Sequence, residues 1–352
     1  MASEMMRGLT MLGDRTAEVR SFALPSVGPG EVRFRVRSAG ICGSDLHFYR
    51  DTPESLGDRR GVVIGHEPAG VVDAVGAGVT GFRPGDRVTV NHTLGCGSCE
   101  YCLGTETVLC PNAYRGMAQA GRGADAEYCA MPAENVVHLA DELTFTDGSF
   151  VACTGATAWG ALEKVRGEVT GGLVVFGLGP VGLSVVLLAD AMGLPLAAVD
   201  PNAQRRAFAA DLVPGLAVLH PEEVRTPADA ASPTVPGLSG APDAAVDTSG
   251  APAAQRQALR IVRPQGTVVL VGLADTGGEQ PVLDPADIIH LEKRVVGSKV
   301  LPLRRTPGLM RFLVAHDLHF DRLVTRRVAL DEAPAAVAEF DRGAVGKFVI
   351  EP

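Results

Sequence analysis

The chain has 352 residues, of which 46% are hydrophobic and 21% charged. This composition excludes an intrinsically disordered protein and is enough for about two domains. The formal net charge of −9 argues against a general nucleic-acid or anionic-membrane surface. The sequence has no apolar run of about 18 residues that would predict a membrane-spanning helix. The charged segment 1–20 also lacks the apolar centre of a secretory signal, so we expect a cytoplasmic, reducing location.

The first part of the chain, residues 1–150, has the pattern of a mainly β domain. Short apolar runs bounded by glycine and proline predict strands at 32–36, 71–75 and 88–90. The segment from 29 to 36 is a Pro-Gly-Glu turn followed by alternating apolar and charged residues, which is typical of a half-buried strand.

Between residues 151 and 290, short apolar runs alternate with segments of helical spacing. The predicted strands are 173–176, 196–199, 217–219, 244–246 and 267–271. The predicted helices are 181–192, 203–212 and 253–262. This alternation predicts a parallel sheet with helices on its faces. The segment 221–242 is rich in Pro, Ala and Ser, and we expect it to run over the surface.

From residue 291 the pattern changes again, with a helix expected near 331–340 and a final strand at 347–350. The chain therefore predicts an α/β domain at 151–290, inserted into a domain made of 1–150 and 291–352.

Four of the seven cysteines lie in one glycine-rich loop, at about 91–112. Cys96, Cys99, Cys102 and Cys110 have the spacing C-x2-C-x2-C-x7-C. Four thiolates close a tetrahedral shell, which indicates a structural Zn²⁺. An iron–sulfur cluster or unligated thiols are the alternatives, although the spacing differs from that of bacterial ferredoxins.

Three other segments each contain one potential metal ligand: Cys42 in 40–47, His66 in 65–70 and Cys153 in 152–155. A lone cysteine or histidine is more often a structural side chain than a ligand. Together, however, two thiolates and an imidazole leave one tetrahedral position open, which a catalytic zinc requires. The seventh cysteine, Cys129, has no partner at metal-binding spacing, and we expect a buried core thiol.

A glycine-rich motif follows the strand expected at 173–176 and begins the next helix. It consists of Gly177, Leu178, Gly179, Pro180, Val181 and Gly182. This context predicts a dinucleotide site with the pyrophosphate at the helix N-terminus. Asp200 ends the next strand, where a carboxylate accepts the ribose hydroxyls and repels a 2′-phosphate, which favours NAD over NADP. Arg205 and Arg206 follow closely and could instead hold a phosphate.

Together these motifs resemble the zinc-dependent medium-chain dehydrogenase/reductase family of the alcohol, sorbitol and threonine dehydrogenase type, over essentially the whole chain. The resemblance implies a GroES-like, mostly β catalytic domain and a Rossmann domain that binds NAD. It also implies two zinc ions per chain, one structural and one catalytic. Cys42, His66 and Cys153 match the catalytic ligands, a set known from alcohol dehydrogenases. Glu67 matches an acidic residue that can transiently replace water on the metal.

The resemblance also implies roles for other residues that match positions of the family's motifs. Asp45 matches a carboxylate that orients the histidine ligand, although it could instead cap a helix. Ser44 matches the group that hydrogen-bonds the substrate oxygen, and His47 the solvent end of a proton relay, unless it is only a surface residue. The remaining matches concern the cofactor: Arg205 near the adenosine ribose, Lys347 near the pyrophosphate, and Thr157, Val271, Gly272 and Leu273 near the nicotinamide or in the core.

The resemblance implies hydride transfer from a zinc-bound alkoxide to NAD, and a homodimer or homotetramer. We expect the substrate to be a small alcohol with a secondary hydroxyl, such as a polyol, sugar or cyclitol. Residues 43–49 favour polyol-type relatives, whereas a cysteine at 153 is typical of alcohol dehydrogenases proper. Simple alcohols and amino-alcohols of the threonine type therefore stay open. An inactive zinc- and nucleotide-binding protein is the alternative of another class.

Overall fold

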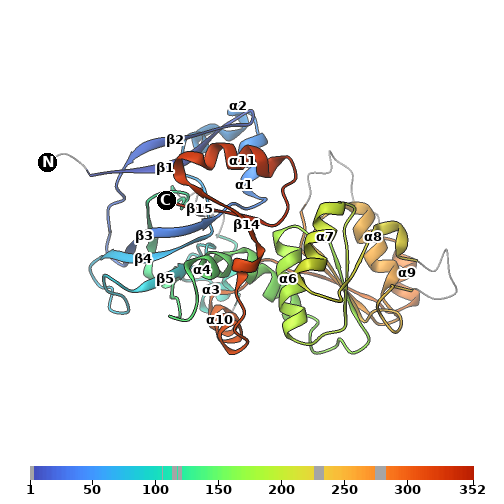
Figure 1. Cartoon of the computed structure of the whole chain (residues 1–352). Helices are drawn as coiled ribbons and strands as arrows, with labels where there is room; N and C mark the ends of the chain where they lie inside the picture. The colour runs from blue at the N-terminus through green and yellow to red at the C-terminus, as the bar shows by residue number, and fades with distance from the viewer. Residues whose placement is uncertain (1–3, 105, 113–116, 118–120, 226–233, 274–282) are drawn as a thin grey trace. The chain divides into compact units, whose positions relative to one another are not determined.

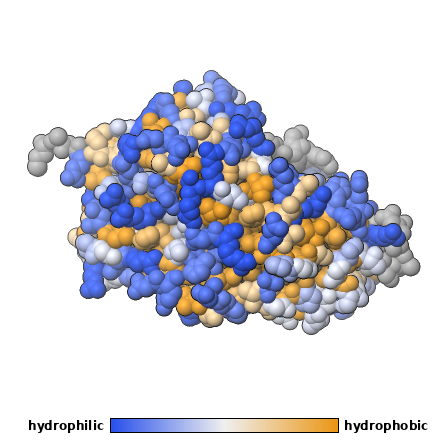
Figure 2. Space-filling view, viewed as in Figure 1, coloured by the Kyte–Doolittle hydropathy of each residue, from blue (hydrophilic) through white to orange (hydrophobic). Residues whose placement is uncertain are grey.

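The computed structural model describes residues 4–104, 106–112, 117, 121–225, 234–273 and 283–352. The chain divides into two compact units. The first comprises Met1–Ala156 and Leu301–Pro352, and the second comprises Thr157–Val300. None of the described helices is long and apolar enough to cross a membrane. Figure 2 shows hydrophilic residues over much of the visible face, with hydrophobic residues between them.

In the first unit, the described residues form a seven-stranded sheet with the order β14-β15-β3-β4-β5-β7, and β6 pairs with β3 beside this path. Figure 1 labels β14, β15, β3, β4 and β5 of this sheet. The strands are β3 (Glu31–Gly40), β4 (Pro68–Val75), β5 (Arg87–Val90), β6 (Tyr128–Pro132), β7 (Val136–His138), β14 (Val324–Ala329) and β15 (Lys347–Glu351). They contain the strands predicted at 32–36, 71–75, 88–90 and 347–350. Val32, Phe34 and Val36 alternate with charged residues and are fully buried in the core.

A hairpin of β1 (Met5–Gly13) and β2 (Thr16–Ala23), which the sequence did not predict, pairs antiparallel in the same unit. The turn between them is made by Asp14 and Arg15, both at positive φ, of 49° and 56°. Asp14 is a common turn residue, but it is followed by Arg15 rather than by the glycine of the strong Asp-Gly hairpin signal, so the sequence signal for a hairpin is weak here.

Helices connect and cover the strands of this unit. They are α1 (Asp45–Arg50), α2 (Pro53–Leu56), α3 (Glu100–Leu103), α4 (Phe145–Ala152), α10 (Thr306–Ala315) and α11 (Ala333–Asp341). Helix α5 (Thr154–Glu163) begins in this unit and continues into the second one. The helix predicted near 331–340 is α11. Helix α4 begins with a capping box, in which the Thr144 hydroxyl accepts from the Asp147 N–H and the Asp147 carboxylate accepts from the Thr144 N–H. It ends at Cys153, its C-cap. The N-terminal end of this buried helix is therefore fixed by local sequence.

The described residues of the second unit form a six-stranded parallel sheet with the order β10-β9-β8-β11-β12-β13. Its strands are β8 (Leu173–Phe176), β9 (Leu196–Val199), β10 (Ala217–Leu219), β11 (Ala244–Asp247), β12 (Thr267–Leu270) and β13 (Arg294–Gly297). Its other helices are α6 (Pro180–Ala191), α7 (Ala203–Leu212), α8 (Pro252–Ile261) and α9 (Pro285–His290). Numbered within the unit, the strand order is 3-2-1-4-5-6, which is that of a Rossmann fold. The predicted fold class is confirmed.

The border between the units differs from the predicted one in two ways. Strand β13 pairs in parallel with β12, so the second unit continues to Val300 rather than ending at 290. Cys153, which the sequence placed in the α/β domain, belongs to the first unit. The segment expected to run over the surface, 221–242, includes 226–233, which lie outside the described residues.

Candidate metal and cofactor sites

The four-cysteine loop brings its thiols together at spacings that suit a tetrahedral metal ion. The Sγ atoms of Cys96 and Cys102 are 3.9 Å apart, and those of Cys99 and Cys110 are 3.7 Å apart. Four thiolates at about 2.3 Å from Zn²⁺ would be separated by about 3.8 Å. Hydrogen bonds from the Ser98 backbone N–H and hydroxyl lower the pKa of the Cys96 thiol to about 5. The donor set therefore fits zinc.

A second cluster joins the three weaker sequence segments. One ligand atom from each of Cys42, His66, Glu67 and Cys153 lies within 4.8 Å of the others. Cys42 follows β3, His66 and Glu67 precede β4, and Cys153 ends α4, so three separate segments meet here. A hydrogen bond with the Cys153 thiol and the charge of His66 lower the pKa of Cys42 well below its usual value. The same hydrogen bond raises the pKa of the Cys153 thiol well above its usual value. Of these two thiols, Cys42 is therefore the one favoured as the thiolate that a metal requires.

Asp45 fixes the orientation of this cluster from the first turn of α1. Its Oδ1 lies 3.1 Å from Nδ1 of His66, and its Oδ2 accepts a hydrogen bond of 2.8 Å from the Cys42 N–H. When Nδ1 donates to the carboxylate, Nε2 carries the lone pair that can bind a metal. The N-cap of α1 is Ser44 rather than Asp45. Asp45 thus makes contacts to two of the candidate ligands, beyond any effect on the helix.

Glu67 lies in a fully buried network with a lysine. Its Oε1 accepts a hydrogen bond of 2.8 Å from the Thr154 hydroxyl, and its Oε2 lies 2.8 Å from Nζ of Lys347. The same Nζ donates to Thr154 at 2.9 Å. A Cβ atom on Gly40 would lie only 2.5 Å from Oε2 of Glu67, so a side chain at this position would collide with the pair. Burial raises the pKa of Glu67 to about 7, although Lys347 opposes the shift.

This environment changes the interpretation of Lys347. The sequence placed it near the cofactor pyrophosphate, but its side chain has no exposed surface and its ammonium is bound to Glu67 and Thr154. We therefore assign it to the Glu67 network. Ser44, the N-cap of α1, and His47, in its first turn, are both exposed.

The structure adds a residue that the sequence did not single out. The ring of His92 meets the ring of His66 edge-on, with 4.9 Å between centroids and 64° between planes. Its Nδ1 lies 2.8 Å from the carbonyl oxygen of Ala152, next to Cys153. His92 lies in the segment between β5 and the four-cysteine loop. A single histidine without ligand spacing gives no sequence signal, since this proximity arises only in the folded sheet.

The glycine-rich turn between β8 and α6 has the geometry of a dinucleotide site. Gly177 has φ +87°, and a Cβ atom on Gly182 would lie 1.8 Å from the carbonyl oxygen of Gly177. Only glycine allows this close packing of the helix on the turn. Helix α6 then begins with Pro180, and no side chain caps its N-terminus, so the N–H groups that follow Pro180 are available to a phosphate.

Asp200 directly follows β9, and its side chain is hydrogen-bonded to this turn. Its Oδ2 accepts a hydrogen bond of 2.7 Å from the Leu178 N–H, and its Oδ1 accepts one of 2.7 Å from the Asn202 N–H. A cavity of about 510 Å³ opens beside it, lined among others by Gly177, Gly179, Asp200, Arg205, Thr248 and Ser249. These residues can hold the adenosine side of a dinucleotide.

Four residues expected near the nicotinamide do not line this cavity. Thr157 is almost buried, whereas Leu273 is 92% exposed. A Cβ atom on Gly272 would lie 2.2 Å from the backbone nitrogen of Gly250, so Gly272 is required by close packing of two loops. Val271 bonds through its N–H to the carbonyl oxygen of Asp247. For Gly272, these contacts therefore support a role in packing rather than a contact with the nicotinamide.

Two family models match the chain. The alcohol dehydrogenase GroES-like domain matches residues 28–141, and the zinc-binding dehydrogenase model matches residues 180–315. The chain is 33% identical to YphC of Escherichia coli, an uncharacterized zinc-type alcohol dehydrogenase-like protein, over 96% of both chains. The chain belongs to the zinc-dependent medium-chain dehydrogenase family.

The chain is also similar to two other proteins, one found by sequence and one by structure. The sorbitol dehydrogenase of Macaca fascicularis is 30% identical over 95% of this chain and 92% of its own. A zinc-binding dehydrogenase from Sinorhizobium meliloti, whose crystal structure was solved bound to NADP, superposes with a TM-score of 0.85. It is 26% identical, and the match covers 99% of this chain and 100% of that one.

Proposed function

We propose that this family member is an NAD-linked dehydrogenase with two zinc ions, which oxidises a secondary hydroxyl of a polyol, sugar or cyclitol. The observation that carries the proposal is the meeting of Cys42, His66 and Cys153, with Asp45 on the far nitrogen of the imidazole. Two thiolates and one imidazole leave one tetrahedral position for a substrate oxygen.

Each part of the chain would contribute one element of the reaction. When bound, zinc supplies a Lewis acid for the substrate oxygen, and the nicotinamide supplies a hydride acceptor. Cys42, His66 and Cys153 would hold the metal, and Asp45 keeps the imidazole in the required tautomer. Ser44 would accept the proton of the substrate hydroxyl while it releases its own hydroxyl proton toward His47, which is exposed and would pass a proton on to solvent. Glu67, held by Lys347, is the proposed alternate ligand.

The preference for NAD rests on Asp200, whose carboxylate lines the cavity beside the glycine-rich turn. A fixed carboxylate there favours ribose hydroxyls and opposes the charge of a 2′-phosphate. Arg205 lines the same cavity and is the residue through which NADP could be accepted. The NADP bound to the Sinorhizobium protein makes a direct comparison of the two cofactors necessary.

The decisive experiment combines zinc analysis with a substrate screen. The purified protein should contain two zinc ions per chain and reduce NAD with members of a panel of polyols, sugars, amino-alcohols and simple alcohols. His66→Ala should lose one zinc ion and turnover but still bind NAD. Full activity of that variant would reject the assignment. Two zinc ions and bound NAD without turnover on any alcohol would instead support an inactive binding protein. Light scattering would test the proposed homodimer or homotetramer.

A further inference from the structure

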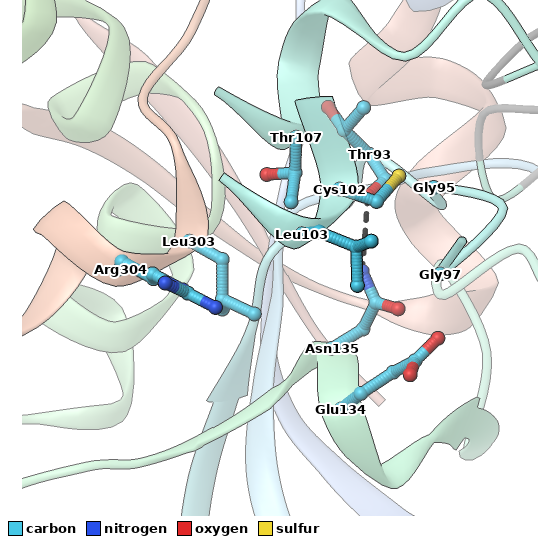
Figure 3. A pocket seen from close by; sticks show the side chains of 10 residues that line it. All are labelled: Thr93, Gly95, Gly97, Cys102, Leu103, Thr107, Glu134, Asn135, Leu303 and Arg304. Carbon is cyan, nitrogen blue, oxygen red and sulfur yellow. Dashed lines mark hydrogen bonds between the residues drawn. The ribbon is translucent and has the colours of Figure 1, made fainter. Parts of the chain in front are cut away.

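A second cavity, of about 280 Å³, lies beside the four-cysteine loop and is lined only by residues of the first unit. Its volume is close to the lower end of the usual range for small-molecule sites, about 300 Å³. Three segments form its wall: the four-cysteine loop, the 3₁₀ turn Ala133–Asn135 and the 3₁₀ turn Leu303–Arg305 (Figure 3). The candidate ligands of the catalytic zinc do not line it, so the proposed reaction does not account for this cavity.

The walls of the cavity are joined to one another by hydrogen bonds and an ion pair. Nδ2 of Asn135 donates to the carbonyl oxygens of Asn91 and Thr93, at 3.1 and 3.0 Å, and these bonds are buried. They attach the turn that contains Asn135 to the segment leading into the four-cysteine loop. Arg305 forms an ion pair with Glu106 of that loop. The three walls are therefore held together without a ligand, which reduces the entropic cost of binding one.

One side of the cavity offers two hydrogen-bond acceptors. Both hydrogens of the Asn135 Nδ2 are used by carbonyl oxygens, so its Oδ1 is an acceptor in a fixed position. Figure 3 shows this oxygen and the carboxylate of Glu134 on the same side of the pocket. Glu134 is exposed, and within the described residues neither acceptor has a donor. Two acceptors, one of them charged, suit an ammonium group, which only donates hydrogen bonds.

The opposite side of the cavity offers a cation and an apolar surface. Arg304 is exposed and, in the described part of the chain, forms no ion pair, unlike its neighbour Arg305. Figure 3 shows Arg304 beside Leu303, on the side opposite to Glu134, and in this view Leu103 lies between them. Leu103 is 65% exposed, so covering it with an apolar group would remove apolar surface from water. The planar guanidinium of Arg304 suits a carboxylate.

We infer that this cavity is a binding site for a small zwitterion whose two charges are separated by an apolar chain, that is, an ω-amino carboxylate. Its ammonium group would lie against Glu134 and Asn135, and its carboxylate against Arg304. Its methylene groups would cover Leu103 and Leu303. An α-amino acid has both charges on one carbon and no apolar chain between them. The inference goes beyond the proposed function, because binding here needs neither turnover nor a nicotinamide cofactor.

Binding is tested with 6-aminohexanoate and with hexanoate and hexylamine, which each lack one of its charges. The zinc-loaded protein carries ¹³C-labelled leucine methyl groups, and we expect saturable shifts of the Leu103 and Leu303 signals at millimolar 6-aminohexanoate. Leu109 is the internal control, since it is 50% exposed near these residues but does not line the cavity. Hexanoate and hexylamine should each bind about fivefold more weakly, the effect of about 1 kcal/mol for an exposed ion pair. Shifts that do not saturate, equal binding of the three compounds, or an equal shift of Leu109 would overturn the inference.

Two variants test the roles of the charged residues. In Arg304→Gln, 6-aminohexanoate should bind no better than hexylamine, and in Glu134→Gln it should bind no better than hexanoate. Arg83→Gln and Asp141→Asn are the matched controls, with side chains that are 87% and 96% exposed away from the cavity. Both should bind all three compounds as the wild type does, and the same loss in variants and controls would reject the assignment.

Two further outcomes separate this inference from the other proposals. If light scattering shows that Arg304→Gln or Glu134→Gln dissociates the protein, the cavity is part of a contact between subunits and the inference is wrong. If the wild type oxidises no alcohol with either cofactor, the proposed function fails, whereas the methyl spectra still decide whether the zwitterion binds.

Discussion

The Nζ atom of Lys347 lies 2.8 Å from Oε2 of Glu67, and neither side chain has any exposed surface. Each charge is far from water, so each depends on the other and on the Thr154 hydroxyl. Burying such a pair requires free energy to remove both charges from water. Removing one partner destabilises the fold further, because the other charge is then buried without a partner. The pair also stands beside His66, where an unpaired carboxylate would compete for the metal.

Lys347→Met should lower the free energy of unfolding by about 3 kcal/mol, the usual cost of leaving one buried charge unpaired. The double variant Lys347→Met, Glu67→Gln should be more stable than the single one. The pair Arg83–Asp86, with Arg83 87% exposed, is the control, and Arg83→Met should cost less than about 1 kcal/mol. Urea denaturation measures all three. If the Lys347 and Arg83 variants lose the same free energy of unfolding, the buried pair stabilises the fold no more than an exposed pair does.

Cys99→Ser should reduce the zinc content from two ions per chain to one, because three thiolates and a hydroxyl bind zinc poorly. The remaining ion should belong to the cluster around His66. Cys129→Ala is the control, since that thiol is buried and lies 3.5 Å from the Arg122 carbonyl rather than at a metal site. Elemental analysis after dialysis gives the counts. Two ions in the Cys99 variant would contradict the four-thiolate assignment.

Asp200→Ala should raise the relative use of NADP. Removing the carboxylate removes its repulsion of a 2′-phosphate, which is worth roughly tenfold or more at contact distance, and leaves Arg205 in the cavity. The ratio of kcat/KM for NAD and NADP is the measurement. Asp211→Ala, on the exposed side of α7, controls for a general loss of charge. An unchanged ratio in the Asp200 variant would count against its role in cofactor choice.

Asp243 should make the stability of the second unit depend on pH in the acidic range. Its carboxylate accepts from the N–H groups of Thr170, Gly171 and Gly172, at 2.6 to 3.2 Å, and from Arg263 at 2.6 Å. Burial opposes ionisation, but these donors outweigh it and lower the pKa of Asp243 to about 2.

The unfolded value is about 3.9, so the ionised side chain stabilises the fold above pH 4 by roughly 2 kcal/mol. This contribution should be lost as the pH falls from about 4 to about 2. Asp243→Asn should remove that part of the pH dependence in thermal melts, whereas Asp141→Asn, whose side chain is 96% exposed, should not. A pH profile of Asp243→Asn that follows the wild type below pH 4 would refute the assignment.

The sequence predicted the second unit better than the first for a physical reason. Buried parallel strands are short continuous apolar runs, and the bounds of β8, β9 and β10 were predicted to the residue. Strand β13 was missed because two charged residues, Lys293 and Arg294, stand at its start, and its place is set by pairing with β12.

The candidate metal ligands were found through motif and resemblance, and the structure brings them together. Two features could not be found in this way. Lys347 was assigned to the cofactor because its partner, Glu67, is distant in sequence and joins it only through the pairing of β15 with β3. His92 was overlooked because its contact with His66 depends on the ends of two different strands.

The order of the first unit along the chain has a consequence for synthesis on the ribosome. Glu67 is made before the second unit and Lys347 after it, since Thr157–Val300 is inserted between them. The second unit is one continuous segment and can fold while the first still lacks β14 and β15. Until β15 emerges and pairs with β3 at Gly40, Glu67 has no counter-ion. All of the candidate metal ligands are therefore translated long before the lysine that pairs with Glu67.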